Sequence, residues 1–237
     1  MACRGASLFY GLCFATMGWL LVVVLRFAVH LLSGLTAGFM LLGPVVAIGL
    51  YALSRQREAG EPIRLIPTLT AWKSTRGAIG VYSLMLIIIY LLWARASMVS
   101  FALFYEGSMP TIEGFLGAIL RLEDLEFIAV YTFVGSFFAI LVYAFSVVSV
   151  PLMLDRDQDA VTAVIASVLA LSRNFPALLL WGALIAGLIL SGIVSGFLGL
   201  IVTGPWVGHA SWHAFRALVE PLPATPVNHI GPNAQNA

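Results

Sequence analysis

Long apolar stretches separated by short polar segments dominate the hydrophobic pattern of this 237-residue chain. A helix needs about 20 mostly apolar residues to cross the hydrocarbon core of a bilayer. The pattern therefore predicts an all-α fold, a polytopic bundle of about six transmembrane helices that form one domain over residues 1–219. The predicted spans are residues 8–25, 31–53, 78–104, 127–154, 177–194 and 197–219, with the last turn among Ser191–Gly196. Residues 220–237 are expected to form a flexible tail.

Three connections between spans carry apolar residues at helical spacing, which is typical of amphipathic helices. They are Asp155–Asn174, Pro62–Lys73 and the stretch Ile112–Leu120. In the first, aspartates cluster at the start and Arg173 stands at the end, as the helix dipole favours. In the second, Pro67 is expected to restrict the helix to its second half. We expect both to lie flat at the inner membrane interface, whereas the third either does the same or caps the bundle.

The composition agrees with a membrane protein, because 61% of the residues are hydrophobic and only 10% are charged. A soluble domain could not keep that much apolar surface away from water, whereas a bilayer solvates it with hydrocarbon. The net charge of +1 provides no basic field for nucleic acid. The two cysteines, Cys3 and Cys13, match no disulfide or metal framework. The expected partners are the lipid bilayer and other membrane proteins, with no nucleic acid.

The distribution of lysine and arginine predicts the orientation of the chain. Nine of the cations fall in segments that the six-span topology places on one side: Arg4, Arg55, Arg57, Arg64, Lys73, Arg76, Arg156, Arg173 and Arg216. The other side carries Arg26 and Arg121, the latter beside several acidic residues. The positive-inside rule makes the first side cytoplasmic, and an even number of spans then places both termini in the cytoplasm.

Two stretches share a frame that suggests an internal repeat. Gly38–Arg55 and Gly199–Glu220 each contain a Gly-Pro pair followed eleven residues later by arginine, and both descend toward the cytoplasm in the predicted topology. This indicates a parallel repeat rather than an inverted one. Pro44, Pro151 and Pro205 each interrupt a predicted span, either as hinges or as static kinks; we favour static kinks because proline is common in membrane helices.

His209 and His213 are the candidates for cofactor binding. Their spacing of four residues places both imidazoles on one helix face, where they could hold one metal ion or flank one haem. Such a site usually needs further ligands from facing helices, and no third ligand is evident. The interpretation that we favour is structural: both histidines lie near the inner interface and form hydrogen bonds to headgroups or backbone, with Trp206 and Trp212 as interfacial belt residues. The cofactor, if there is one, is unknown.

Arg95 is the only charged residue well inside a predicted span. If the third helix starts at Ala78, Arg95 lies about 25 Å along it and can extend its side chain to the outer interface. If the helix starts later, Arg95 lies in mid-membrane and needs an acidic partner. No acidic residue lies at comparable depth, which favours the first alternative.

The stretches GPVVAIGLYALSRQREAGEP, PLMLDRDQDAVTAV and PWVGHASWHAFR resemble a bacterial integral-membrane family of unknown function, domain of unknown function 2189. The resemblance extends from about Ser7 to Val219. Some members are labelled as a cytochrome c oxidase subunit. The resemblance implies a bacterial inner-membrane location but no reaction. Family members usually carry a polar amphipathic segment ahead of the first span, and here that span begins almost at Met1.

No sequence motif for catalysis or phosphate binding is present, and no pair of carboxylates lies inside a predicted span. We therefore expect no enzymatic activity. The leading hypothesis is an accessory or assembly partner of another membrane complex, with a respiratory oxidase as the candidate suggested by the family label. The alternatives are a small oligomeric transporter or channel, and a haem- or metal-binding protein that uses His209 and His213.

Overall fold

The computed structural model describes residues 2–27, 46–104 and 125–219, and these form helices and short turns without a strand. The helices are α1 (Ala2–Phe27), a helix over residues 46–58, α3 (Leu65–Leu69), the one-turn 3₁₀ helix η2 (Ala71–Lys73), α4 (Arg76–Phe104), α6 (Leu125–Ser146), α7 (Ser149–Arg156), α8 (Ala160–Arg173), α9 (Phe175–Val194) and α10 (Leu200–Leu218). The predicted all-α helical class is confirmed for this part of the chain.

Four of the described helical segments are long and apolar enough to cross a membrane: Arg4–Val23, Arg76–Ser100, Leu125–Arg156 and Phe175–Val194. They correspond to the predicted first, third, fourth and fifth spans. The predicted second span lies partly outside the described residues. Pro44 and the stretch at 112–120 lie wholly outside them. The predicted sixth span coincides with α10, which is not among the four. The total of six crossings therefore stays a prediction.

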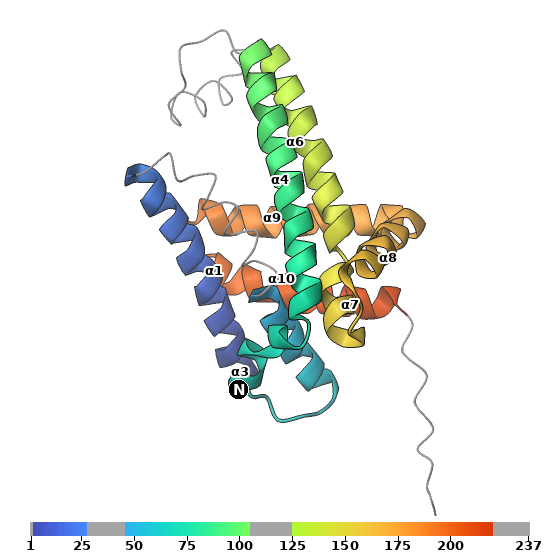
Figure 1. Cartoon of the computed structure of the whole chain (residues 1–237). Helices are drawn as coiled ribbons and strands as arrows, with labels where there is room; N and C mark the ends of the chain where they lie inside the picture. The colour runs from blue at the N-terminus through green and yellow to red at the C-terminus, as the bar shows by residue number, and fades with distance from the viewer. Residues whose placement is uncertain (1, 28–45, 105–124, 220–237) are drawn as a thin grey trace, which may run out of the picture.

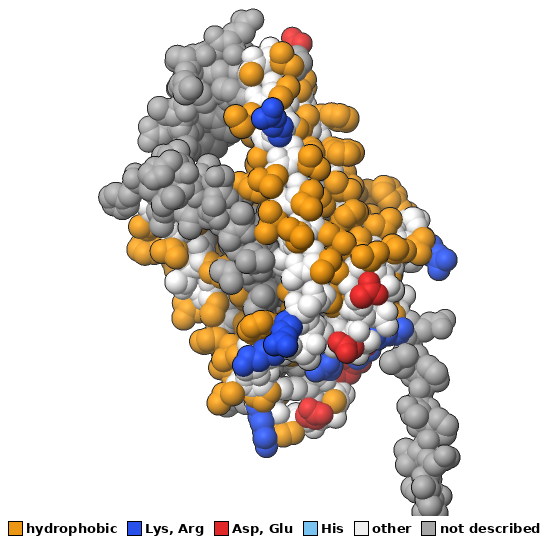
Figure 2. All heavy atoms as spheres, in the orientation of Figure 1, with side chains coloured by type: hydrophobic (Ala, Val, Ile, Leu, Met, Phe, Trp, Pro, Cys, Tyr) orange, Lys and Arg blue, Asp and Glu red, His pale blue; other side chains and the backbone are white. Residues whose placement is uncertain are grey.

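Helices α4 and α6 form an antiparallel pair, which extends away from the rest of the molecule (Figure 1). α10 packs against both α1 and α9, and in Figure 1 α9 and α10 run across the direction of α4 and α6. The main buried cluster lies where the lower ends of α4 and α6 meet α7, α8, α10 and the helix over residues 46–58, and includes Trp212, Phe215, Tyr82 and Met153. In Figure 2 charged side chains gather at that lower end, and hydrophobic ones cover most of the upper length of the α4–α6 pair.

The predicted fourth span is interrupted between α6 and α7, just ahead of Pro151. Pro151 lies in the first turn of α7, where its missing N–H costs no helical hydrogen bond. Ser167 of α8 compensates for the interruption: its hydroxyl donates to Ala144 O at 2.7 Å and accepts from Val148 N–H at 3.1 Å. The Ser149 hydroxyl has two acceptors within reach, Phe145 O of α6 and Ala163 O of α8, the latter at 3.1 Å. A second helix therefore bridges the break, and the preference for a static kink over a hinge stays a prediction.

Three glycines let α1, α10 and the helix over residues 46–58 approach one another closely. A Cβ atom at Gly11 of α1 would overlap the carbonyl oxygen of Ile201 in α10. One at Gly49 would overlap the ring of Tyr10 in α1, and one at Gly208 of α10 would come too close to Leu50. Each helix thus contributes one glycine to a contact with the next. Small residues of this kind permit backbone-to-backbone packing in membrane proteins. We call this arrangement the three-helix junction.

The amphipathic connections are helical as predicted. α8 is capped by Asp159, whose carboxylate accepts from the N–H groups of Val161 and Thr162 at 2.9 and 3.0 Å. Its Ala160, Ala163, Val164 and Ser167 face the protein, whereas most of the predicted apolar stripe is exposed: Val161, Ile165, Val168 and Leu169.

The connection Pro62–Lys73 departs from the prediction at its start. We expected Pro67 to confine the helix to the second half of this stretch, but α3 begins at Leu65. Pro67 occupies the third residue of that helix, within the first turn, where no N–H donor is needed.

Candidate functional site

His209 lies at the centre of the three-helix junction and bonds to both of the other helices. Its Nε2 is 2.8 Å from Ser7 Oγ of α1, and its Nδ1 is 2.7 Å from Ser54 Oγ of the helix over residues 46–58. Because α10 approaches both helices closely at Gly208 and through the contact with Gly11, the imidazole reaches both serines directly. His209 therefore bonds to two serines that precede it in the sequence by 202 and 155 residues.

Both ring nitrogens of His209 are engaged by serine hydroxyls, which can donate or accept a hydrogen bond. Ser54 Oγ also lies 3.1 Å from Leu50 O, which can only accept. When the Ser54 hydrogen points to Leu50 O, Nδ1 of His209 is the donor to Ser54 Oγ.

His213 lies one turn further along α10 and is exposed. The two histidines therefore lie in different environments, although they share a helix. A metal ion or haem iron at His209 would have to displace one of the two serines. Among the described residues no group of three or more His, Cys, Asp and Glu side chains lies close enough to hold a metal ion. Cofactor binding by His209 and His213 stays a prediction.

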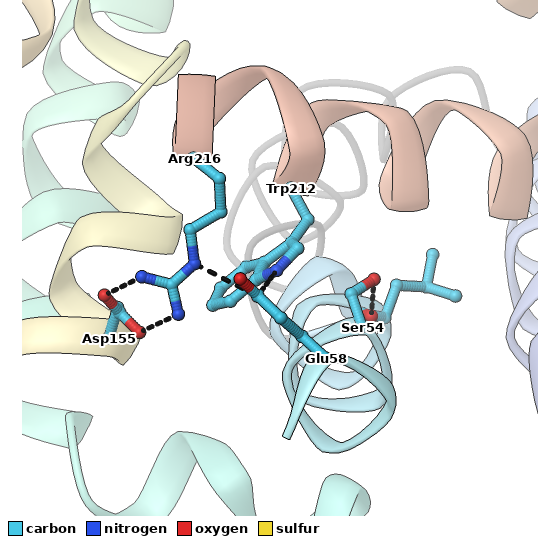
Figure 3. Close-up of polar contacts among 6 residues, drawn as sticks. Ser54, Glu58, Asp155, Trp212 and Arg216 are labelled. Atoms are coloured by element: carbon cyan, nitrogen blue, oxygen red, sulfur yellow. Dashed lines mark hydrogen bonds and ion pairs between the residues drawn. The ribbon is translucent and has the colours of Figure 1, made fainter. Parts of the chain in front are cut away.

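A second polar constellation, the end clamp, lies at the C-terminal end of α10 and consists of Arg216, Asp155, Glu58 and Trp212 (Figure 3). Arg216 donates from Nη1 and Nη2 to the two carboxylate oxygens of Asp155 at 2.8 and 2.9 Å. Its Nε donates to Glu58 Oε2 at 3.1 Å. The same oxygen accepts from Trp212 Nε1 at 2.9 Å. One guanidinium thus joins α10, α7 and the helix over residues 46–58.

The contact between Arg55 and α7 extends this connection. Arg55 Nη1 donates to Leu154 O at 2.9 Å, near the C-terminal end of α7. Carbonyl groups in the last turn of a helix have no intrahelical partner, and a cation there also suits the helix dipole. Together with the end clamp, this contact joins the ends of the predicted second, fourth and sixth spans. The internal repeat, in which these arginines occupy equivalent positions, stays a prediction. The structure describes only two of its three prolines, Pro151 and Pro205.

The electrostatics of Glu58 follow from these contacts. Desolvation opposes ionisation of its carboxyl, but the hydrogen bonds from Trp212 and Arg216 and the charge of Arg216 outweigh it. The pKa of Glu58 is therefore lowered from its ordinary value. The Glu58 side chain is 44% exposed, whereas that of Asp155 is only 10% exposed. The Arg216–Asp155 pair is thus better shielded from solvent than the Arg216–Glu58 pair.

The two tryptophans of α10 do not share the interfacial role that we expected. Trp206 is 62% exposed, as a belt residue would be. Trp212 is fully buried in the main core cluster, with the guanidinium of Arg216 4.9 Å from its ring centroid. The prediction was wrong for Trp212 because Glu58 supplies a partner for its indole N–H, which allows the whole ring to be buried.

The other charged and proline sites are simpler. Arg95 is exposed on the surface of α4, and no described carboxylate pairs with it. Pro205 lies inside the continuous helix α10. Neither residue belongs to the three-helix junction or to the end clamp.

Sequence reasoning missed four residues of the two constellations: Ser7, Ser54, Glu58 and Asp155. Asp155 was noted only as part of an acidic helix start. Glu58 follows Arg55 by three residues and so lies on the same helix face, which is the one signal that could have indicated it. Nothing in the sequence singles out Ser7 or Ser54, because serine is common and its partner is distant.

Comparison with known families gives one finding. The family model described as predicted integral membrane protein (DUF2189) matches residues 31–155, which is more than half of the chain. No curated protein and no solved structure matches the chain. The family description names no partner complex, so the link to cytochrome c oxidase is not confirmed. The matched region contains Arg55, Glu58 and Asp155, and the apolar helices α4 and α6 agree with the description. The chain therefore belongs to this family of integral membrane proteins of unknown function.

Proposed function

We propose that this protein is a non-enzymatic accessory or assembly partner of another complex in the bacterial inner membrane, with both termini in the cytoplasm. The observation that carries the proposal is the outward face of α9. Only Leu178 and Gly192 of its 20 residues are buried, so this helix contributes little to the protein's own core.

The outward face of α9 has the composition of a helix-packing surface. Ala183, Gly187 and Ser191 follow one another at intervals of four residues, and all three are exposed. A Cβ atom at Gly187 would meet nothing within 4 Å. Stripes of small residues at this spacing allow two membrane helices to approach closely, whereas lipid contact does not require them. This surface therefore fits a helix of a second membrane protein.

The remaining polar side chains support a structural role. His209 and Arg216 are engaged in the three-helix junction and the end clamp, where their donors and acceptors bond to other parts of the chain. Such joints would keep α10, against which α9 packs, in a fixed position relative to α1 and α7. A scaffold that presents one apolar helix to a partner needs that rigidity.

Co-purification from native membranes in mild detergent tests the proposal. We expect the tagged protein to retain another membrane protein, and the double variant Ala183→Leu, Gly187→Leu to lose it without a change in thermal stability. Gly80→Leu on α4, also exposed with nothing within 4 Å of its Cβ position, is the matched control and should retain the partner. If the wild-type protein is strictly monomeric and brings down no membrane protein, the proposal is wrong.

A respiratory oxidase is the partner that the label on some family members suggests. Haem absorbance in the co-purified material, and its loss with the α9 double variant, would identify such a partner. Haem that remained bound to the isolated chain would instead favour the cofactor hypothesis for His209 and His213.

A transporter is the second candidate, supported by a cavity of about 720 Å³ among α4, α6, α9, α10 and the helix over residues 46–58. Aromatic and aliphatic side chains line it, with Tyr51, Ser146 and Ser211 among its few polar groups and no charged residue. This lining suits an apolar molecule rather than an ion. Gly135 lines the cavity, and nothing lies within 4 Å of its Cβ position. Gly135→Leu would therefore place a side chain in the cavity and should reduce the selective flux of an apolar molecule into proteoliposomes. Absence of flux in the wild type would exclude this candidate.

A further inference from the structure

A second cavity, of about 570 Å³, lies beside the three-helix junction, between α1, the helix over residues 46–58 and α10. Its polar lining includes Arg4 of α1, Arg57 of the helix over residues 46–58 and His209. No carboxylate is among the residues that line it. The cavity therefore combines two guanidinium groups with no compensating negative charge.

The two arginines are available for an external anion. Within the described part of the chain, neither Arg4 nor Arg57 takes part in an ion pair, and both side chains are exposed. Arg57 neighbours Glu58 in sequence, but the Glu58 carboxylate binds Arg216 and Trp212. Guanidinium groups bind phosphate oxygens through paired N–H donors.

Apart from Ser7, the rest of the cavity wall is apolar, and it continues onto the outer surface. Leu8, Val202 and Trp206 line it and are 46%, 44% and 62% exposed. Tryptophan favours the headgroup level of a membrane. The cavity thus has cations in one part and an apolar groove in another. These two parts are complementary to a phospholipid, in which a phosphate is attached to acyl chains.

We propose that this cavity binds an anionic phospholipid, with its phosphate at Arg4 and Arg57 and the start of an acyl chain along Leu8, Val202 and Trp206. His209 forms part of the wall, and both of its ring nitrogens already bond to serines. A free phosphate ion shares the headgroup chemistry but would gain nothing from the apolar wall. The lipid is therefore the occupant that uses the whole cavity.

Ligand-dependent thermal unfolding of the purified full-length chain in detergent tests the proposal. The probes are phosphatidylglycerol, zwitterionic phosphatidylcholine and inorganic phosphate. We expect phosphatidylglycerol to raise the unfolding temperature most, and Arg4→Gln, Arg57→Gln to weaken its apparent affinity by roughly tenfold or more. Arg64→Gln, Lys73→Gln is the matched control, because both of these residues are exposed but neither lines the cavity. It should bind within about twofold of the wild type.

Three outcomes would overturn the proposal. Equal stabilisation by phosphatidylcholine would show that the charge is not recognised, and an equal effect of inorganic phosphate would show that the apolar wall is not used. Equal loss in both double variants would indicate diffuse surface charge rather than a site. Val202→Trp keeps both arginines but fills the groove, so it provides a second measurement if the arginine variant fails to fold. It should weaken phosphatidylglycerol binding, and unchanged binding would contradict the assignment.

Discussion

At the scale of single residues, two polar side chains of α10 form hydrogen bonds between segments that lie far apart in the sequence. His209 joins α1 to the helix over residues 46–58, and Arg216 joins α7 to the same helix. Both connections depend on positions that no local pattern in the sequence brings together. The histidine that seemed to offer a cofactor site has both ring nitrogens in hydrogen bonds to the protein.

Replacement of His209 by alanine should destabilise the protein by about 1–3 kcal/mol, because Ser7 and Ser54 lose a partner and the junction loses its link. His213→Ala on the exposed face should change stability by less than about 0.5 kcal/mol. Thermal unfolding of both variants in the same detergent measures the difference. Equal effects would mean that the hydrogen bonds of His209 contribute nothing specific.

The lowered pKa of Glu58 predicts how the end clamp responds to acid. A carboxyl whose pKa is lower in the folded than in the unfolded protein stabilises the fold fully above the unfolded pKa, here near 4.5. That contribution is lost as the pH falls through the lower folded value. Glu58→Gln keeps an acceptor for Trp212 but removes the charge, so it should cost less than about 1 kcal/mol at pH 7. The stability difference from the wild type should close as the pH falls from about 4.5 through the lower folded pKa, and a difference that persisted or grew in acid would contradict this assignment.

At the scale of elements, the contacts between helices depend on small residues and on serine hydroxyls. Gly11→Ala should destabilise the protein by about 1–3 kcal/mol, because the added Cβ meets a backbone carbonyl that cannot move aside alone. Gly80→Ala on α4 is the control, since nothing lies within 4 Å of its Cβ position. It should be neutral or stabilising by up to about 1 kcal/mol. Unfolding temperatures of the two variants measure the difference, and equal values would contradict the close approach of α1 and α10 at Gly11.

The break between α6 and α7 makes a separate prediction. Ser167→Ala leaves the buried Val148 N–H and the Ala144 carbonyl without their α8 partner, which should cost about 1–3 kcal/mol. Ser172→Ala removes only an exposed hydrogen bond within α8, to Leu169 O, and should have little effect. If the two alanine variants unfold at the same temperature, α8 does not hold the kink.

The elements were predictable to the extent that their causes are local. α1, α4, α9 and the turn at Ser195–Gly199 follow from apolar length and from breaks in it, and α8 follows from its periodicity. The His209 bonds could not be predicted, since the approach of three helices is set by packing over more than 150 residues. Burial of Trp212 likewise depends on a carboxylate from another helix. The interruption before Pro151 was foreseen, but the serine that holds it was not.

At the scale of the whole molecule, the exposed apolar surface of α4, α6 and α9 and the charged lower end fit the family's description as integral membrane proteins. The orientation in the bilayer stays a prediction and can be tested by labelling. In a background with Cys3 and Cys13 replaced by serine, Glu126→Cys should react with an impermeant maleimide in intact spheroplasts. Thr70→Cys, on the predicted cytoplasmic side and also exposed, should react only after permeabilisation. The reverse pattern would overturn the orientation.

The joining of α1 to α10 has a consequence for the order of assembly in the cell. Ser7 and His209 are 202 residues apart, so α1 leaves the ribosome long before its partner exists. At about 5–20 residues per second, this interval is on the order of ten seconds or more. During that time α1 can pack against the helix over residues 46–58, where Tyr10 meets Gly49, but Gly11 still lacks its contact in α10. The early packing of α1 is therefore one-sided, and the three-helix junction closes only when α10 has been made.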